Sequence, residues 1–310
     1  MGLTGIAEDC SVKEIGNNMV IVTNVDIFTP IHDDPVIMGE ITACNSTNDL
    51  FAMNVVDIVM YLSFLGVPMD QPQEVTEGLL SGQIQFLKQF NARVDGGHTI
   101  INPWPLMGGI VVGISDKKDL IPKQLNPDIL QGDLILTKPM GLQAVMAAYR
   151  VLKTQPSLLE DFDQDSLKNS IKLGEKIMRM SNYNVSKTIR DENLHDFISA
   201  MTDITGFGLN IHASEMIQER TFDITIHTLP IIQNSDRLSQ LFGYDLLGGC
   251  SAETAGAMLI ALDTNKIDTE EFQRILKSVN VNSWKVGSFK KGSGKTKIID
   301  DIETIQIEKI

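Results

Sequence analysis

Segments rich in β-branched residues alternate with amphipathic segments along the first half of the chain, and this alternation constrains the fold most strongly. Strands are expected where apolar and β-branched residues are dense, at residues 19–25 (MVIVTNV), 55–65 and 108–114. Apolar and small residues at helical spacing predict helices over residues 36–53, with Pro35 at the start, and 74–90. The pattern indicates an α/β (α+β) fold whose sheets can be mixed or largely antiparallel.

A loop-like sequence, LNPDILQG at residues 125–132, separates two halves, and the following LILTKP predicts a new strand. We therefore expect two domains, residues 1–130 and 131–310. In the second half, periodicity predicts helices at 142–152, before residue 180 and at 269–279, a strand–turn–helix unit at 199–218, and strands near 222–227, 258–262, 284–288 and 297–300.

The charge balance limits the partners of this protein. Twenty-six basic and 40 acidic side chains give a formal net charge of −14, and the basic residues form no cluster larger than Lys290-Lys291 and a few neighbours. Such a surface repels nucleic acid and anionic membranes. Asn54 and Asp57 interrupt the most membrane-like stretch, residues 51–69. Three widely spaced cysteines without a CxxC pair predict a reducing, cytoplasmic setting.

The common nucleotide and hydrolase motifs GxxxxGK[ST], GxSxG and HExxH do not occur. Four carboxylates instead stand at strand ends, late in a helix or in Gly/Thr-rich turns: Asp9, Asp26, Asp49 and Asp203. Mg²⁺ takes hard oxygen ligands and bridges nucleotide phosphates through a few carboxylates. Each residue alone is also explained by a cap or a solvated turn, and Asp203 in particular could cap the helix that follows it.

The segment DGGHTIINPWP, residues 95–105, is a second candidate binding element. Gly96 and Gly97 would let backbone amides approach a ligand, and His98 and Thr99 could donate hydrogen bonds to it. A tight turn with a surface histidine explains the same residues.

Taken in order, six segments resemble the successive signature blocks of the selenophosphate synthetase (selenide, water dikinase) family, within the aminoimidazole ribonucleotide synthetase superfamily. They are VDIFTPIHDDP, NDLFAM, GGHTIINPWP, GDLILTKPMG, MTDITGFG and CSAETAG. The resemblance spans the chain from Gly5 to about Asp300.

The resemblance implies an ATP-dependent transferase that converts ATP, selenide and water into selenophosphate, AMP and phosphate. It implies a homodimer in which the N-terminal ATP-binding and dimerisation domains pair into a shared β-barrel, with a C-terminal α/β domain and ATP between the two domains. The Mg²⁺ ligands it implies are Asp9, Asp49 and Asp203. The ATP contacts it implies are Ala7, Glu8, Asp9, Asp26, Asp49, Gly96, Gly97, His98 and Thr99.

This chain departs from the family pattern at several positions. The family carries a reactive Cys or selenocysteine and an essential Lys ahead of the block matched by Gly5–Val12, where this chain begins. The catalytic residues therefore stay unassigned, and we expect slow ATP hydrolysis with little selenophosphate. Replacements inside the blocks are Glu40 for Arg, Asn48 for Ser, and Asn54 and Ile211 for Gly. Two alternatives stay open: a nucleotide-binding paralogue without selenide activity, and a superfamily enzyme acting on another small nucleophile.

Overall fold

The computed structural model describes residues 8–217 and 221–310 of this protein. The described residues form two compact units, and each is described here by itself. The N-terminal unit comprises residues 8–120 together with 179–191, and the C-terminal unit comprises residues 121–178 and 192–310 apart from 218–220. The division into domains 1–130 and 131–310 stays a prediction.

One five-stranded sheet forms the basis of the N-terminal unit. Its strands are β1 (Ser11–Gly16), β2 (Met19–Phe28), β3 (Asp57–Val67), β4 (Val94–Ile101) and β5 (Leu106–Asp116). They lie in the order β1-β2-β5-β3-β4 and are antiparallel except for the parallel pair β3 and β4. Helix α2 (Gln73–Leu87) and a 3-10 turn at Lys88–Phe90 connect this pair, because parallel strands require a crossover.

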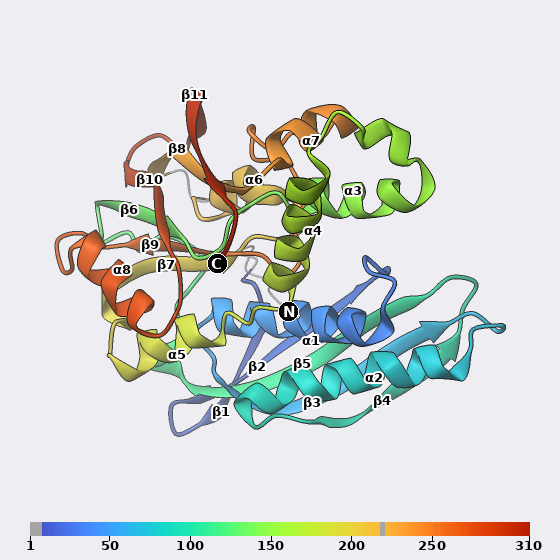
Figure 1. Ribbon diagram of the computed structural model, residues 1–310. Helices are drawn as coiled ribbons and strands as arrows, with labels where there is room; N and C mark the ends of the chain where they lie inside the picture. The colour runs from blue at the N-terminus through green and yellow to red at the C-terminus, as the bar shows by residue number, and fades with distance from the viewer. Residues whose placement is uncertain (1–7, 218–220) are drawn as a thin grey trace. The chain divides into compact units, whose positions relative to one another are not determined.

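Helices α1 (Pro35–Ala52) and α2 pack together on one face of this sheet (Figure 1). Asp34 caps α1, its side chain accepting hydrogen bonds from the backbone N–H groups of Val36 and Ile37. Pro35 stands in the first turn, where its missing N–H costs nothing. The strands contribute buried side chains to this layer, among them Val20, Val22, Tyr61 and Leu65.

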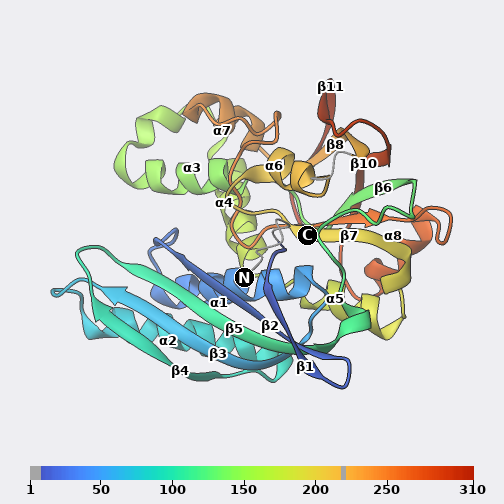
Figure 2. The same ribbon diagram turned by 180° about the vertical axis from the view of Figure 1, so that it is seen from behind.

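The view from behind shows the opposite face of the sheet (Figure 2). Apolar side chains on this face are partly exposed. The strand register places Val25 of β2 opposite Ile110 of β5, and Ile110 opposite Leu62 of β3. Val25 keeps 60% of its surface exposed, and Ile27, two residues further along β2, keeps 42%. We call the row Val25, Ile110 and Leu62, together with Ile27, the open sheet face.

A six-stranded sheet forms the C-terminal unit. Its strands are β6 (Gln131–Leu136), β7 (Ile198–Asp203), β8 (Phe222–Ile232), β9 (Met258–Leu262), β10 (Trp284–Lys291) and β11 (Thr296–Ile307). Their order is β11-β8-β10-β6-β9-β7, with β11 and β8 parallel and the other pairs antiparallel. Its helices are α3 (Leu142–Thr154), α4 (Gln164–Met178), α6 (Gly208–Glu215), α7 (Ser235–Phe242) and α8 (Thr269–Ser278). Helix α3 packs against both α4 and α7 (Figure 1).

The expected fold of two mixed α/β parts is confirmed, and the strands and helices predicted from periodicity are present. The sequence did not indicate β1, β4, α5 (Tyr183–Asp191) or α7. Every residue of β1 is exposed, so it lacks the alternation that marks a half-buried strand. The tight turn considered for the GGH segment is wrong, because residues 96–98 lie inside β4.

Candidate metal and nucleotide site

Two of the predicted ligands come together in the N-terminal unit. Asp9 lies just before β1 and Asp49 lies near the end of α1, and one carboxylate oxygen of each lies within 4.8 Å of the other. Both residues are half-buried. Two carboxylates at this separation repel each other, and a bound cation removes that repulsion. Their oxygens are the donors that Mg²⁺ prefers, so the residues present fit the metal that the sequence predicts.

Asp26 of β2 contacts helix α1, the helix that carries Asp49. Its carboxylate accepts a hydrogen bond from the Nδ2 of Asn45, which lies one helical turn before Asp49. The Tyr61 hydroxyl is buried against Gly109, the strand partner of Asp26, where an added Cβ would lie 2.4 Å from Tyr61 Oη. Burial raises the pKa of Tyr61, and the charge of Asp26 raises it further. The phenol therefore stays neutral beneath the carboxylate.

A second part of the N-terminal unit comes from far along the chain. Residues 179–191, which we call the strap, lie along one side of α1. The strap contacts α1 at positions three or four residues apart, which share one helical face. Arg179 pairs with Glu40, the carbonyl of Met180 accepts from the Cys44 thiol, Asn182 donates to Asn48, and Ser186 donates to the carbonyl of Phe51.

The strap gives partners to two residues that depart from the family pattern. Glu40 stands where Arg is usual and forms an ion pair with Arg179. Asn48 stands where Ser is usual, and its Oδ1 accepts a 2.8 Å hydrogen bond from Asn182 Nδ2. Both asparagines are buried. These departures are therefore accommodated by specific contacts.

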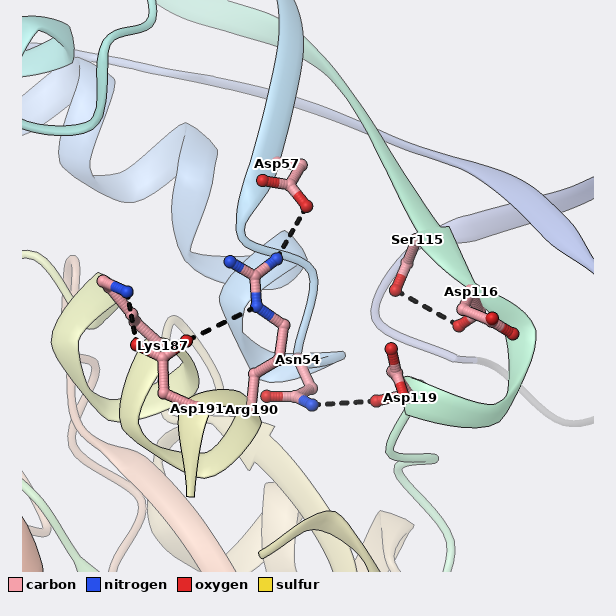
Figure 3. Close-up of polar contacts among 8 residues, drawn as sticks. All are labelled: Asn54, Asp57, Ser115, Asp116, Asp119, Lys187, Arg190 and Asp191. Carbon is pink, nitrogen blue, oxygen red and sulfur yellow. Dashed lines mark hydrogen bonds and ion pairs between the residues drawn. The ribbon is translucent and has the colours of Figure 1, made fainter. Parts of the chain in front are cut away.

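The end of the strap is held at the start of β3 (Figure 3). Arg190 Nη1 lies 2.6 Å from a carboxylate oxygen of Asp57, and Lys187 pairs with Asp191 one turn along the same helix. Nearby, Asn54 has a positive φ of 63° and donates a 2.8 Å hydrogen bond to the carbonyl of Asp119. Asparagine tolerates this left-handed conformation, which explains how it replaces the family glycine.

The predicted nucleotide contacts of the GGH segment lie at the other edge of the same sheet. β4 is separated from β2 by β5 and β3, so Gly96–Thr99 lie three strand spacings, about 14 Å, from Asp26. Gly97 also has a structural role, because its φ is +151° and a Cβ there would lie 2.0 Å from the carbonyl oxygen of Ser63. The exposed His98 pairs with Phe64 across the sheet. Glu8 is half-buried, and Ala7 lies outside the described residues.

Asp203 belongs to the C-terminal unit. It is the last residue of β7 and keeps only 2% of its surface exposed. The alternative that it caps the following helix is wrong, because α6 begins at Gly208 after Phe207 and has no side-chain cap. A nearly buried carboxylate that does not cap a helix needs another compensation for its charge.

Lys123, His212 and Glu215 form a charged cluster next to the turn that follows Asp203. His212 of α6 keeps 5% of its surface exposed, and its Nδ1 lies 3.2 Å from the carboxylate of Glu215. Lys123 Nζ lies 2.6 Å from the same Glu215 oxygen. Burial lowers the pKa of His212, against the opposing effect of the Asp203 charge. The ring is therefore neutral near pH 7.

The CSAETAG block also has a defined place in the C-terminal unit. The Glu253 carboxylate accepts hydrogen bonds of 2.8 and 3.0 Å from the backbone N–H groups of Gly141 and Leu142, at the start of α3. Burial raises the pKa of Glu253 to about 8. Lys138, at the end of the LTKP segment, is buried and donates a 2.6 Å hydrogen bond to the carbonyl of Ala255. Sequence reasoning noted this block only through its resemblance to the family.

The two units match two family models, which define the class of protein. Residues 7–115 match the N-terminal domain of AIR synthase related proteins, and residues 132–300 match their C-terminal domain. This class combines the two mixed α/β parts described above.

Similar proteins within this class narrow the family to which the chain belongs. The chain is 39% identical over 310 residues to the selenide, water dikinase of Methanocaldococcus jannaschii, covering 98% of this chain and 87% of the relative. It is 37% identical over 309 residues to the selenide, water dikinase of Methanococcus maripaludis, covering 98% and 90%. The human selenide, water dikinase 2 matches at 29% over 98% of this chain and 69% of its own. This chain therefore belongs to the selenide, water dikinase family.

Solved structures with the same fold include proteins of other names. Thiamine monophosphate kinase from Aquifex aeolicus superposes with a TM-score of 0.70 at 13% identity, over 98% of this chain and 95% of its own. Hydrogenase maturation protein HypE in complex with ATP superposes with a TM-score of 0.69 at 12% identity, over 93% and 83%. At these identities the likeness shows the fold alone. None of the described helices has the length and apolar character of a membrane span.

Proposed function

We propose that this protein is a selenide, water dikinase that converts ATP, selenide and water into selenophosphate, AMP and phosphate. Identities of 37–39% over 98% of the chain to two relatives of that name support this reaction. The observation that carries the site is the close approach of the Asp9 and Asp49 carboxylates within the N-terminal unit. A reducing, cytoplasmic setting is part of the proposal, because selenide is readily oxidised.

The proposed Mg²⁺ ligands are Asp9, Asp49 and Asp203. Asp9 and Asp49 fit the metal by their separation, and Asp203 by its near-complete burial at a strand end. Bound Mg²⁺ would offset the charge of the ATP phosphates and stabilise charge that develops during phosphoryl transfer. An acidic protein without a Lys-bearing phosphate loop needs such metal ions to hold a polyphosphate.

The proposed nucleotide contacts are Asp26 and the segments Ala7–Glu8 and Gly96–Thr99. Asp26 is oriented by Asn45, so its carboxylate is fixed before a ligand arrives. Such preorganisation reduces the entropy lost on binding. For Ala7, Glu8 and the β4 residues, the support is their match to the family blocks.

We further propose a homodimer in which two N-terminal sheets pair through the open sheet face into a shared barrel. The exposed apolar side chains Val25 and Ile27 support this arrangement, since a face of this kind is commonly covered by a partner. Closing two sheets into a barrel also removes their exposed edges.

The reaction is tested by ³¹P NMR of the products formed from ATP and Mg²⁺, with and without selenide under anaerobic conditions. The sequence alone predicts slow ATP hydrolysis with little selenophosphate. The identities of 37–39% to selenide, water dikinases replace that with the expectation of selenide-dependent formation of selenophosphate, AMP and phosphate in equal amounts. Asp49→Asn is the variant expected to abolish it, and Asp70→Asn, in an exposed loop, is the matched control. Selenide-independent ATP turnover would instead support an enzyme acting on another nucleophile, and nucleotide binding without turnover would support a silent paralogue.

A further inference from the structure

Four residues of the C-terminal unit form a continuous polar cluster, of which Lys123 and His212 are buried and Glu215 and Thr205 are half-buried. Lys123 Nζ lies 2.6 Å from Glu215 Oε2, and the same oxygen lies 3.2 Å from His212 Nδ1. On the other side of the ring, His212 Nε2 lies 3.3 Å from both the backbone nitrogen and the hydroxyl of Thr205. Lys123 and His212 keep 6% and 5% of their surfaces exposed.

The surrounding backbone holds this cluster together from three segments. The backbone N–H of Leu125 donates to the carbonyl of Met216 at 3.0 Å, which ties the segment carrying Lys123 to the end of α6. The backbone N–H of Met201 donates to the carbonyl of Pro122 at 3.1 Å, which ties the same segment to β7. Lys123, β7 and α6 are therefore fixed relative to one another within the unit.

The hydrogen bonds determine which nitrogen of His212 carries the proton. A backbone N–H can only donate, so Nε2 must accept from Thr205 and is unprotonated. The single proton of the neutral ring then lies on Nδ1, the nitrogen that is 3.2 Å from the Glu215 carboxylate. The ammonium of Lys123 offsets the charge of that carboxylate, which would otherwise be costly to bury.

His212 connects this polar cluster to the turn that begins after Asp203. Thr205 lies two residues beyond Asp203, and its carbonyl also accepts a 3.1 Å hydrogen bond from the backbone N–H of Glu253. The backbone N–H of Thr205 is thus bound by His212, and its carbonyl is bound by Glu253 of the CSAETAG block. The direction of the Asp203 side chain depends on the backbone that these two contacts fix.

We propose that His212, oriented by Glu215 and Lys123, is a positioning residue that fixes the Thr205 turn and thereby aims the Asp203 carboxylate at the metal. This inference rests on the proposed function, in which Asp203 is a Mg²⁺ ligand. Residues that orient a metal ligand commonly change metal affinity by about 10–100-fold when they are replaced. Lys123, Glu215 and His212 contribute no atom to the reaction itself.

Two substitutions of His212 separate its two contacts. The amide of His212→Gln reaches the position of Nε2, so its oxygen can still accept from the Thr205 N–H. The shorter His212→Asn reaches only the position of Nδ1 and loses that contact. Ser214→Ala is the control on the same helix, since it removes only an exposed hydrogen bond to the carbonyl of Asn210.

The measurement is calorimetric binding of a non-hydrolysable ATP analogue at increasing Mg²⁺ concentration, with thermal unfolding of each variant alongside. We expect the Mg²⁺ concentration for half-maximal binding to rise about 10–100-fold in His212→Asn. In His212→Gln and Ser214→Ala we expect a change of less than about threefold, below the range for lost positioning contacts. An unchanged Mg²⁺ requirement in His212→Asn, or an equal rise in both His212 variants, overturns the inference.

A second measurement needs no substitution. In ¹⁵N NMR of the histidine-labelled protein at neutral pH, one of the five histidines should show an unprotonated Nε2 and a protonated Nδ1, and His212→Gln should remove that signal. The opposite tautomer at His212 overturns the inference even if His212→Asn does not fold. Failure of the proposed function looks different: wild-type protein would then bind the analogue equally well in EDTA.

Discussion

Asn182 donates a 2.8 Å hydrogen bond to the side-chain oxygen of Asn48, a residue 134 positions earlier in the chain. Both amides are almost completely buried, and Asn48 directly precedes Asp49 in α1. The bond is part of the row of contacts by which the strap covers one side of this helix. The helix that carries a proposed metal ligand is therefore held by residues that belong, in sequence, to the second half of the protein.

The Asn182–Asn48 bond predicts a coupled loss of stability. Asn182→Ala leaves the buried amide of Asn48 without this partner, so we expect a loss of about 1–3 kcal/mol in the free energy of unfolding. In Asn48→Ala/Asn182→Ala the loss should be smaller than the sum of the two single losses, because neither amide then remains buried without the other. Urea denaturation measures all three variants. Lys187→Ala, which removes an exposed ion pair on the same strap, should change the value by less than about 0.5 kcal/mol; equal effects would contradict the prediction.

The proximity of Asp9 and Asp49 predicts metal-dependent nucleotide binding. In calorimetric titration, ATP should bind in the presence of Mg²⁺ and bind far more weakly in EDTA, because two carboxylates without a cation repel the phosphates. Asp49→Ala should lose most of the Mg²⁺-dependent affinity, whereas Asp70→Ala should not. ATP binding of equal strength in EDTA would show that the carboxylate pair does not act through a metal.

The open sheet face predicts a dimer that one charge can disrupt. Light scattering at low micromolar concentration should give a mass twice the 34.2 kDa of one chain. Val25→Lys places a charge in the row with Ile110 and Leu62, and we expect it to shift the mass to that of one chain, since burying an unpaired charge is costly. Leu241→Lys, at an exposed position of α7, should leave the mass unchanged. A monomeric wild-type protein would rule out the shared barrel.

Glu253 predicts a loss of stability as pH rises toward about 8. Its pKa in the folded state is raised by burial to about 8, above that of an exposed glutamate, so the folded protein binds a proton that the unfolded chain releases. The stability from this proton is complete below the unfolded pKa and is lost as pH rises through about 8. Unfolding free energies measured from pH 6 to 9 should fall by at most about 1.4 kcal/mol per pH unit up to about pH 8 on account of this group and should level off above it. Glu253→Gln should remove this part of the slope, and an unchanged slope would contradict the assignment.

Periodicity and composition were sufficient for the elements with large apolar faces. The β-branched run in β2 and the capped, proline-initiated helix α1 carry their signals within a few consecutive residues, because local propensity and burial agree there. β4 was not recognised, since it is glycine-containing and exposed in the single chain, and its strand character comes from pairing with β3. The parallel neighbour provides the backbone hydrogen bonds that the sequence alone does not reveal.

For the candidate site, too, the sequence and the tertiary structure each determined a different part. The sequence by itself determined which carboxylates to consider, because Asp9, Asp26, Asp49 and Asp203 stand at strand ends, in turns or amid apolar residues where an unpaired charge is costly. Only the tertiary structure decided that Asp9 approaches Asp49, that Asn45 holds Asp26, that the strap packs on α1, and that Lys123, Glu215 and His212 form one cluster. The physical reason is that hydrogen bonds and ion pairs act over a few ångströms in space, between residues whose separation along the chain carries no trace of the contact.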